Sequence, residues 1–464
     1  MSSQEEFYEQ LAKLEVEAKT PNSKMKLIIT KEFKEAFNFV NDTNNSCFIT
    51  GKAGSGKSTF IRYLYQKCRK KKILLATTGV AAVNITDDVI KAQTVHSFFH
   101  FPPMPLTYNN LPKINEDYRL KMNSFETIII DESSMLRVDI VFAIDQVLRI
   151  ATGQDIPFGG KQIVFVGDLA QLPPVIGSPA EKEMILHQWE SEFFFHETVI
   201  KDINLKVIEF IQIFRQKDEL FISILNRLRS GDQTQEDVKI INNTCYGKPI
   251  NYADTITLCT TNANAKNIND KQMSLIEGKE IVFNGWLSGK FNDKNCPVER
   301  VITLKVNCRV MVRVNFRELN VYNGSTGIFL GTEEGTNEEG EEEEYMRIKL
   351  DTGKEILLAR HEFKSVEYTY NKEKKHIIPE VIGTFKQYPV ILATATTIHK
   401  SQGMTLERVN IDMGRGAFAS GQVYVALSRC KTLEGITLLQ PIYSRDCFIN
   451  EHVKRFLRNE LPSN

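Results

Sequence analysis

A glycine-rich stretch around residue 55 has the residue types and the spacing of a phosphate-binding loop. Gly51 to Ser58 read GKAGSGKS, which matches the pattern GxxxxGK[ST]. An apolar, β-prone run, Cys47 to Thr50, precedes the loop, and apolar residues at helical spacing follow it. A strand, a glycine loop and a helix in this order bring inward-pointing amides and the positive end of the helix dipole to one place. The stretch therefore predicts binding of the phosphates of a nucleotide.

Individual residues of this loop have separate expected roles. Lys57 is expected to reach the β- and γ-phosphates, and the Ser58 hydroxyl to ligate Mg²⁺. The residues predicted to contact the nucleotide are Gly51, Ala53, Gly54, Ser55, Gly56, Lys57, Ser58 and Thr59. The alternative is a glycine-rich turn that binds nothing, which the flanking strand and helix patterns disfavour. The predicted cofactors are ATP and Mg²⁺.

Acidic and amide side chains follow two further apolar strands. Asp131 and Glu132 come directly after the run Thr127 to Ile130, and Gln171 follows the run Ile163 to Asp168. Asp131 can hold Mg²⁺, and Glu132 can take a proton from the attacking water. Ligands of open parallel sheets lie at the carboxyl ends of the strands, which places Gln171 at the same edge. An acidic strand end alone is a weak signal, but after a phosphate loop it predicts an NTPase site.

Two arginines in the second half of the chain could supply positive charge at the γ-phosphate. Arg215 lies in the segment IFRQ, and Arg429 ends the segment VALSR. Such an arginine finger stabilises the charge that develops on the transferred phosphoryl group. Each could reach the phosphate loop only when the two halves of the chain come together. A surface salt bridge is the alternative for either residue taken alone.

Composition limits the class of protein. The 464 residues suffice for about two to four domains of roughly 100–200 residues each. Lys plus Arg and Asp plus Glu both number 58, so any basic surface must be local. The eight cysteines form no CxxC pair, which is typical of a reduced intracellular protein without a zinc cluster or disulfides. Without an apolar run of about 18 residues or a targeting pattern, we expect a cytoplasmic protein without membrane contact.

Strand and helix patterns predict the organisation of the chain. Short apolar strands alternate with helical segments in both halves, which indicates an α/β fold with parallel sheets. We expect a lead helix at 1–24, a first domain at 25–200 and a second domain at 201–464. Alternating β segments at about 304–387 predict a small inserted β-barrel, in which the run Glu333 to Glu344 forms a solvated hairpin tip. A Pro- and aromatic-rich excursion interrupts the first domain at about 98–122.

Six motifs occur in an order that resembles one group of helicases. They are GKAGSGKS, IIIDESSM, GDLAQLPPV, FRQ, TTIHKSQGMTLERV and GQVYVALSR, and with their surroundings they cover roughly residues 25 to 440. Together they resemble superfamily 1 helicases of the RecD-like branch. The segment Val138 to Gly160 resembles the signature of the Pif (petite integration frequency) helicases within that branch.

The resemblance implies two RecA-like motor domains, a duplex-splitting wedge at about 98–122 and an SH3-like barrel at about 304–387. It implies an ATP-dependent 5′→3′ helicase that translocates on single-stranded DNA and unwinds duplex, forked and G-quadruplex DNA in replication, repair and recombination. We expect a monomer in the absence of DNA, and the compact chain favours a bacterial or phage source. A single-stranded-DNA translocase that unwinds poorly is one alternative. A P-loop kinase or regulatory nucleotide-binding module is another.

The same resemblance implies a DNA-binding set made largely of small and hydroxyl side chains, which suit a sliding grip on phosphates. It comprises Thr78, Gly79, Val80, Ala81, His96, Ser97 and Phe98 in the first half, and Thr260, Thr261, Asn262, Thr397, His399, Lys400 and Ser401 in the second. Gly403 is assigned to the nucleotide site together with Gln171, Arg215 and Arg429. His96 and His399 could instead be core histidines, and Phe98 or Phe99 could pack inward.

One departure from the group concerns the adenine. Related helicases usually carry a glutamine just upstream of the phosphate loop that reads this base. In the corresponding stretch, Ile29 to Phe33, the chain has Phe33 instead. We therefore expect base stacking to replace the hydrogen bonds, and a less strict preference for ATP.

Overall fold

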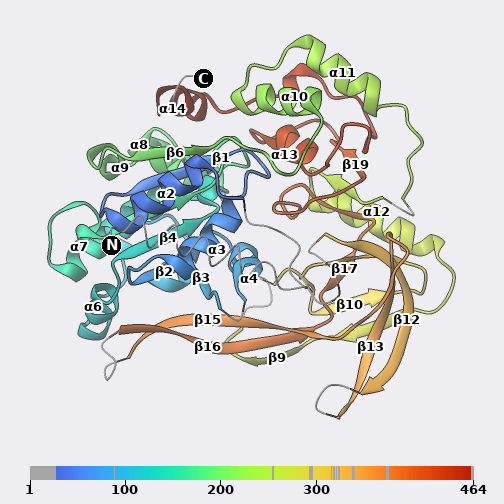
Figure 1. Ribbon diagram of the computed structural model, residues 1–464, viewed down its shortest axis with the longest axis horizontal. Helices are drawn as coiled ribbons and strands as arrows, with labels where there is room; N and C mark the ends of the chain where they lie inside the picture. Colours follow the sequence, from blue (N-terminus) through green and yellow to red (C-terminus); the bar gives the residue numbers. More distant parts are fainter. Residues whose placement is uncertain are drawn as a thin grey trace.

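The computed structural model describes residues 28–87, 89–252, 255–291, 296–314, 316, 319, 321, 324–336, 340–371 and 376–460. Figure 1 shows a first parallel sheet with its helices on the left, a second on the upper right and an all-β region on the lower right. This arrangement confirms the predicted α/β class with parallel sheets. The expected lead helix at 1–24 lies outside the described residues.

Six parallel strands form the first sheet. They are β1 (Cys47–Gly51), β2 (Lys72–Ala76), β3 (Ala92–Thr94), β4 (Thr127–Asp131), β5 (Gln162–Val166) and β6 (Lys206–Phe210), in the order β3-β2-β4-β5-β1-β6. Because every pair is parallel, the carboxyl ends of the strands lie at one edge. The boundary expected at residue 200 falls too early, because β6 pairs with β1 along its whole length.

Successive side chains of each strand point to opposite faces of the sheet, and each face is covered by its own layer of helices. In β1, Cys47 and Ile49 face one apolar cluster, whereas Phe48 faces the other. The first cluster is covered by α2 (Lys31–Asp42), α3 (Lys57–Lys67) and α4 (Gly79–Ile85). The second includes side chains of α5 (Val95–Phe99), α6 (Glu116–Asn123), α7 (Val138–Thr152), α8 (Pro179–Trp189) and α9 (Thr198–Asp202).

The second sheet has four parallel strands in the order β18-β7-β19-β20. They are β7 (Thr257–Cys259), β18 (Ala395–Thr397), β19 (Val409–Asp412) and β20 (Ile436–Leu438). The helices of this half are α10 (Glu219–Ser230), α11 (Gln235–Cys245), α12 (Asn262–Leu275), α13 (Gln422–Ser428) and α14 (Glu451–Glu460). The last of these returns to the first domain, where Phe456 stacks on Phe195 with 4.4 Å between the ring centroids.

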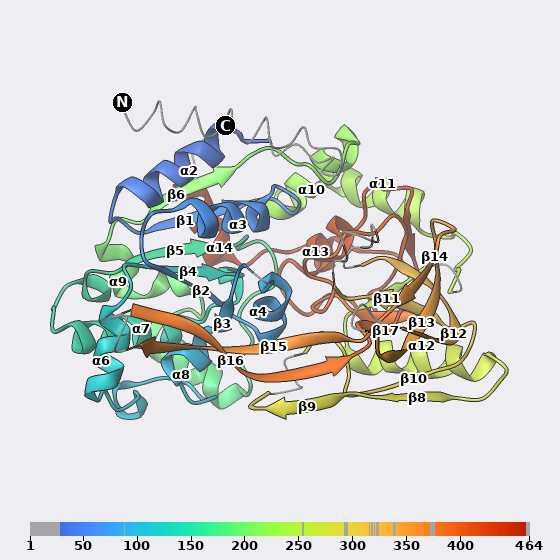
Figure 2. The ribbon, with the colours of Figure 1, turned by 60° about the horizontal axis from the view of Figure 1, so that its bottom comes forward.

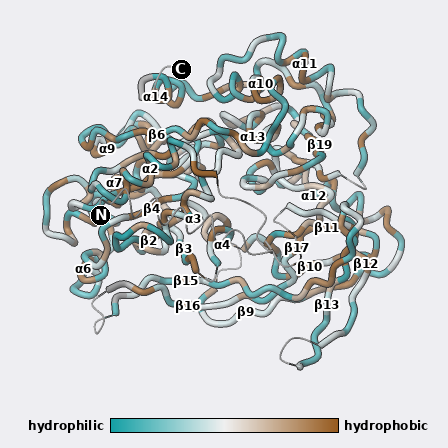
Figure 3. Tube along the Cα trace, in the orientation of Figure 1, coloured by the Kyte–Doolittle hydropathy of each residue, from teal (hydrophilic) through white to brown (hydrophobic). Residues whose placement is uncertain are grey.

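An all-β region is inserted between α12 and β18. It contains β8 (Ile281–Asn284), β9 (Trp286–Gly289), β10 (Val301–Leu304), β11 (Arg309–Val312), β12 (Thr326–Thr336), β13 (Glu342–Leu350), β14 (Glu355–Leu358), β15 (His361–Asn371), β16 (His376–Gln387) and β17 (Val390–Leu392). It therefore starts upstream of the expected residue 304. The sheets β10-β8 and β14-β13-β12-β11-β17 share one apolar core that includes Phe329 and Tyr388. The described glutamates of the run Glu333 to Glu344 lie on the hairpin β12–β13, where Glu333 pairs with Tyr345 and Glu334 with Glu344, and the described residues of this hairpin near its loop are largely hydrophilic in Figure 3.

Strands β15 and β16 form a long antiparallel ribbon that extends from the inserted region to the first domain, as Figure 1 and Figure 2 show. Tyr368 anchors this ribbon: its hydroxyl donates to Lys91 O at 2.6 Å, and its amide donates to Gln93 Oε1 at 3.1 Å. Glu367 lies 3.7 Å from His100. The ribbon therefore ties the second half of the chain to the first through contacts of its own.

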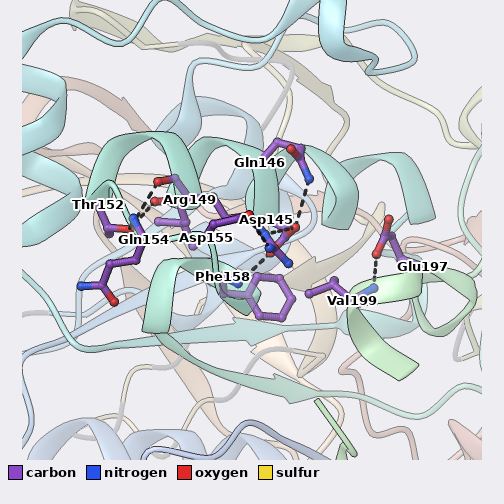
Figure 4. Close-up of polar contacts among 10 residues, drawn as sticks. Asp145, Gln146, Arg149, Thr152, Gln154, Asp155, Phe158, Glu197 and Val199 are labelled. Carbon is purple, nitrogen blue, oxygen red and sulfur yellow. Dashed lines mark hydrogen bonds and ion pairs between the residues drawn. The ribbon is translucent and has the colours of Figure 1, made fainter. Parts of the chain in front are cut away.

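The signature segment Val138 to Gly160 is organised by one carboxylate of α7 (Figure 4). Asp145 accepts hydrogen bonds from Phe158 N at 2.7 Å and from Arg149 Nε at 2.8 Å. Gly159 has a φ of +56°, and a Cβ there would lie 2.4 Å from a side-chain oxygen of α7, so the turn requires glycine. The segment is a fixed turn packed on α7.

Candidate nucleotide site and adjoining grooves

β1 and α3 hold the phosphate loop at the carboxyl edge of the first sheet. Gly54 and Gly56 have φ values of +80° and +90°, a region that favours glycine. A Cβ at Gly54 would lie 2.5 Å from Cβ of Arg215, so this glycine also makes room for the arginine. Lys57 Nζ donates to Gly51 O at 2.6 Å and to a second loop carbonyl at 3.1 Å. The ammonium group therefore lies over the loop that would hold phosphates.

Asp131 and Glu132 lie at the end of β4, at the same edge of the sheet. The Glu132 amide donates to Asp131 Oδ1 at 2.8 Å. Burial, and then the charge of Glu132, raise the pKa of Asp131. Burial also raises the pKa of Glu132, although Lys57 counteracts it. Carboxyl groups in such surroundings are suited to hold a cation or to accept a proton.

Arg215 lies against the phosphate loop, and Arg429 lies close to Arg215. The Phe214 amide donates to Gly54 O at 3.0 Å, which seats the segment before α10 on the loop. Arg215 Nη1 donates to Ser428 O at 3.0 Å, and Arg429 Nη2 donates to Ser428 Oγ at 2.9 Å. The structure thus brings the two predicted arginine fingers together at the end of α13.

Neither arginine forms an ion pair in the described part of the chain, although the charges of Glu132 and Asp168 act on Arg429. Arg429 is 2% exposed, and burial lowers its pKa. Burial and the neighbouring Arg429 lower the pKa of Arg215 to about 9. Among the residues that the structure describes, neither guanidinium has a carboxylate within ion-pair distance. Buried charges without a counter-ion are costly, so this pair is suited to receive an anion such as the γ-phosphate.

A buried polar chain links the phosphate loop to the second domain. Asp168, two residues after β5, accepts hydrogen bonds from Arg229 Nε at 3.0 Å and from the Tyr424 hydroxyl at 3.1 Å. The same hydroxyl accepts a hydrogen bond from Ala53 N at 3.0 Å. Arg229 also pairs with Glu209 of β6 at 2.6 Å. Asp168, Arg229 and Tyr424 are not among the predicted site residues, although Asp168 lies inside the quoted motif GDLAQLPPV and Tyr424 inside GQVYVALSR.

Gln171 lies where the first domain meets α13. Its backbone N–H donates to Asp168 O at 2.9 Å, and the residue is 7% exposed. The adjacent Ala170 carbonyl is so close to α13 that a Cβ at Gly421 would lie 2.1 Å from its oxygen. This predicted residue therefore lies at the junction from which both arginines approach.

A cavity of about 990 Å³, here called the first groove, separates the first domain from the β15–β16 ribbon. Four of the predicted DNA-binding residues line it, namely Thr78, Gly79, His96 and Ser97. The opposite wall contributes Lys290, Phe291 and Lys364, which are not among the predicted residues. Lysines and an aromatic ring facing hydroxyl groups are suited to a nucleic-acid strand.

A cavity of about 620 Å³, here called the second groove, lies between α12, the inserted region and the loop after β18. The predicted residues that line it are Val80, Asn262, Thr397 and Lys400. Gly79 of the first groove and Val80 of the second are consecutive, so the two grooves meet at α4. One strand could therefore pass from one domain to the other.

Two predicted DNA contacts are fully buried in this structure, and Thr260 and Thr397 are each 5% exposed. Phe98 is fully buried and packs edge-to-face on Phe99, with ring centroids 4.9 Å apart, so both phenylalanines point inward. Ser401 is also fully buried, and its hydroxyl donates to Ile398 O at 2.7 Å. Neither side chain faces a groove, because each completes the packing of its own short segment.

The remaining predicted residues are distributed more widely. Thr261 caps α12 and accepts a hydrogen bond from Asn264 N at 3.2 Å. Besides Phe98 and Ser401, the predicted DNA-binding residues that line neither groove are Ala81, Thr260, Thr261 and His399. At Gly403, φ is +80°, and the described residues leave open space around its Cβ position. The roles of these residues stay predictions.

Phe33 does not provide a stacking surface for adenine. It is 5% exposed and belongs to an aromatic cluster under α3. Its ring meets Phe60 edge-to-face at 5.0 Å and stacks on Phe210 at 5.9 Å. The expected base stacking by this residue is therefore wrong, because the ring completes the core of the first domain.

Comparisons with known proteins agree with this geometry. A family model described as PIF1-like helicase matches residues 28–239, and one described as helicase matches residues 371–461. The ATP-dependent DNA helicase Pif1 of Campylobacter jejuni is 31% identical over 83% of this chain and 86% of its own length. The chain belongs to the PIF1-like helicase family. This assignment confirms the family and the DNA helicase class predicted from the six motifs.

Solved structures of the family are also similar to this chain. The complex of Bacteroides sp Pif1 with ADP-AlF4 superposes with a TM-score of 0.84 and 34% identity, over 94% of this chain and 97% of that one. Bacteroides Pif1 bound to ssDNA superposes with a TM-score of 0.65 and 34% identity, over 94% of this chain and 97% of that one. The ATP-dependent DNA helicase PIF1 of Emericella nidulans, which is 29% identical, is longer, and the chain spans 62% of its length.

Proposed function

We propose that this PIF1-like chain hydrolyses ATP to move 5′→3′ along single-stranded DNA, and that it unwinds duplex, forked and G-quadruplex DNA. The observation that carries the proposal is the position of Arg215 against the phosphate loop, with Arg429 joined to it through Ser428. A nucleotide-binding module that only holds ATP has no need of two such arginines. A motor needs them, because it must couple the γ-phosphate to domain closure.

The proposed chemistry divides among the named side chains. Lys57 and the two arginines stabilise the negative charge that develops on the γ-phosphoryl group. Glu132 takes the proton of the attacking water, and its raised pKa favours that role.

Mg²⁺ would neutralise phosphate charge when bound. The Ser58 hydroxyl, which is exposed at the start of α3, and the Asp131 carboxylate are hard oxygen donors that fit this ion. In the described part of the chain no group of three or more metal-binding side chains occurs, so two protein ligands together with phosphate oxygens suit the ion best.

Closure of the cleft is the proposed source of movement. ATP that contacts both the loop and the arginines binds the closed arrangement more tightly, so binding shifts the population toward closure. Hydrolysis removes this preference and lets the cleft reopen. If the two grooves hold the strand alternately, each cycle advances the motor. We propose two RecA-like domains that meet after β6, with an SH3-like barrel formed by the inserted strands.

The proposed wedge is the excursion at about 98–122. Tyr108 in this stretch is 66% exposed and meets Phe142 of α7 edge-to-face at 4.8 Å. Leu106 N donates to Asp139 Oδ2 at 2.8 Å, so α7 braces the excursion. A braced, exposed aromatic loop is suited to divide a duplex.

Location and assembly are part of the same proposal. All eight cysteines are buried thiols without a disulfide, which supports a reducing, cytoplasmic compartment. None of the described helices has the length and apolar character needed to cross a membrane. We propose that the chain is monomeric without DNA, because both arginines that complete the site come from the same chain.

Steady-state ATP hydrolysis with and without single-stranded DNA tests the motor, and unwinding of duplexes with a 5′ or a 3′ tail tests its polarity. Strong stimulation with unwinding only from the 5′ tail is the expected result. Lys57→Ala should lose turnover but keep strand binding. Stimulation without unwinding would favour a translocase, and hydrolysis indifferent to DNA would contradict the motor.

A further inference from the structure

Arg313 is an unusual arginine in the inserted region. It directly follows β11 and is 3% exposed, and among the described residues its Nε and Nη1 atoms have no hydrogen-bond partner. The third nitrogen, Nη2, lies 3.5 Å from Lys400 O, at the limit of a hydrogen bond. By contrast, Arg309 at the start of the same strand pairs with Asp351. The fold therefore buries one guanidinium of this strand with most of its donors unused.

Burial of such a group requires an explanation. Unsatisfied buried donors are rare in folded proteins, and a buried charge without a partner is more costly still. Burial lowers the pKa of Arg313 to about 10, so the group remains charged at neutral pH. Within the described ranges no carboxylate lies at ion-pair distance from it. The described part of the chain thus leaves room beside Arg313 for an anion from another molecule.

Arg313 lines the second groove, where other donors surround it. Thr397 ends β18 and Lys400 follows it on one side, and Asn262 begins α12 on the other. Two acids also line the groove: Asp270 is paired with Lys266 at 2.9 Å, and Glu299 is exposed. The Lys266–Asp270 ion pair of α12 carries no net charge. The two positive charges of Arg313 and Lys400 therefore exceed the one negative charge of Glu299. The second groove is therefore a local cationic site in a chain without net charge.

The lining of this groove also indicates which part of a nucleic acid it contacts. It contains no aromatic ring among the described residues, whereas the first groove contains Phe101 and Phe291. Bases are held mainly by stacking on rings, and backbone phosphates by charged and hydroxyl donors. We propose that Arg313 binds a backbone phosphate of single-stranded DNA in the second groove. This inference rests on the proposed function, because it names the contact that holds the strand in the second domain.

The test measures binding of a labelled oligo-dT strand over a series of salt concentrations. Each phosphate contact contributes about 0.7 to the slope of log K against log salt for single strands. Arg313→Met should weaken binding and reduce this slope by about 0.7. Arg313→Lys keeps the charge and should keep the slope. Arg347→Met removes a half-exposed arginine of β13 outside the groove and should leave both quantities unchanged.

Thermal unfolding of the same variants separates binding from folding. Replacement of an unpaired buried charge by an apolar side chain of similar length should leave the melting temperature equal or higher. Loss of affinity with an intact or raised melting temperature supports the proposal. An unchanged slope in Arg313→Met, or a lowered melting temperature that accounts for the weaker binding, would overturn it. If the unaltered chain fails to bind the strand, the proposed function fails as well, which is a distinguishable result.

Discussion

The hydroxyl of Tyr424 donates a hydrogen bond to Asp168 at 3.1 Å while it accepts one from the amide of Ala53 at 3.0 Å. One side chain of the second domain is thereby bonded both to the phosphate loop and to the residue that follows β5. Its helix, α13, leads directly into Arg429. A shift of the phosphate loop on nucleotide binding would therefore be transmitted through Tyr424 to α13, the helix that leads into Arg429.

Tyr424→Phe tests this coupling without a change in volume. The variant leaves the Ala53 amide and one Asp168 oxygen without a buried partner, which should cost about 1–3 kcal/mol of stability. A coupling free energy of about 1 kcal/mol corresponds to a roughly fivefold change, so we expect the KM for ATP to rise about fivefold. Tyr246→Phe, at a half-exposed position, is the matched control. Normal KM in Tyr424→Phe would restrict the tyrosine to a structural role.

Asp168→Asn should be strongly destabilising, with a defined pH dependence. Burial alone would raise the pKa of Asp168, but Arg229 and Lys57 outweigh it and hold the pKa below its ordinary value. Such a carboxylate stabilises the fold above its unfolded pKa of about 3.9, and this contribution disappears as the pH falls through the folded pKa. We expect a loss of about 3–5 kcal/mol at pH 7.

Urea unfolding of the wild type and Asp168→Asn between pH 7 and strongly acidic pH measures this effect. The difference in the free energy of unfolding should shrink as the pH falls below about 4. Asp155→Asn, whose side chain is 98% exposed, serves as the control and should show no such trend. A difference that is constant over the whole range would mean that Asp168 is not charged in the folded chain.

Arg429→Lys should separate nucleotide binding from hydrolysis. Lysine keeps the charge and much of the buried volume, but it lacks the planar fork that can contact phosphate and Ser428 together. We expect near-normal binding of a non-hydrolysable ATP analogue and a kcat reduced by about a thousandfold. Single-turnover hydrolysis measures the chemical step. Near-normal turnover would remove this residue from the finger role.

Tyr368→Phe should change how the ribbon rests on the first domain. Its hydroxyl loses the 2.6 Å hydrogen bond to Lys91 O. DNA-free Bacteroides Pif1 superposes on this chain with a TM-score of 0.83, against 0.65 for the ssDNA complex, so the present arrangement is closer to the DNA-free form. Loss of this contact between the ribbon and the first domain should favour the arrangement of the ssDNA complex. We therefore expect the apparent affinity for single-stranded DNA to rise by up to about fivefold. Weaker binding would place the contact in the DNA-bound form instead.

Much of the nucleotide site could be predicted because its residues occur in short motifs with fixed spacing. Lys57, Asp131 and Gln171 each follow an apolar strand, and parallel strands end at one edge. Arg215 and Arg429 could be proposed from their motifs, but only the structure shows that Ser428 joins them.

The polar chain behind the loop could not be predicted in the same way. Ala53 and Tyr424 are 371 residues apart, and Asp168 and Tyr424 are 256 apart, so no local pattern connects them. Residue type was also misleading for burial: Phe33 and Phe98 resemble base-stacking residues, yet both complete cores. The burial of Arg313 could not be predicted from the sequence, because an arginine at the end of a strand is usually exposed.

The path of the chain between the two domains limits how the protein could be rebuilt. Phe210 ends β6, and only four residues later the amide of Phe214 is bonded to the phosphate loop. One extra residue in an extended linker adds about 3.3 Å, more than the length of that bond, and would carry Arg215 away from the nucleotide. The halves are therefore not interchangeable modules, and recombination or insertion between β6 and α10 should be selected against more strongly than at any hairpin tip of the inserted region.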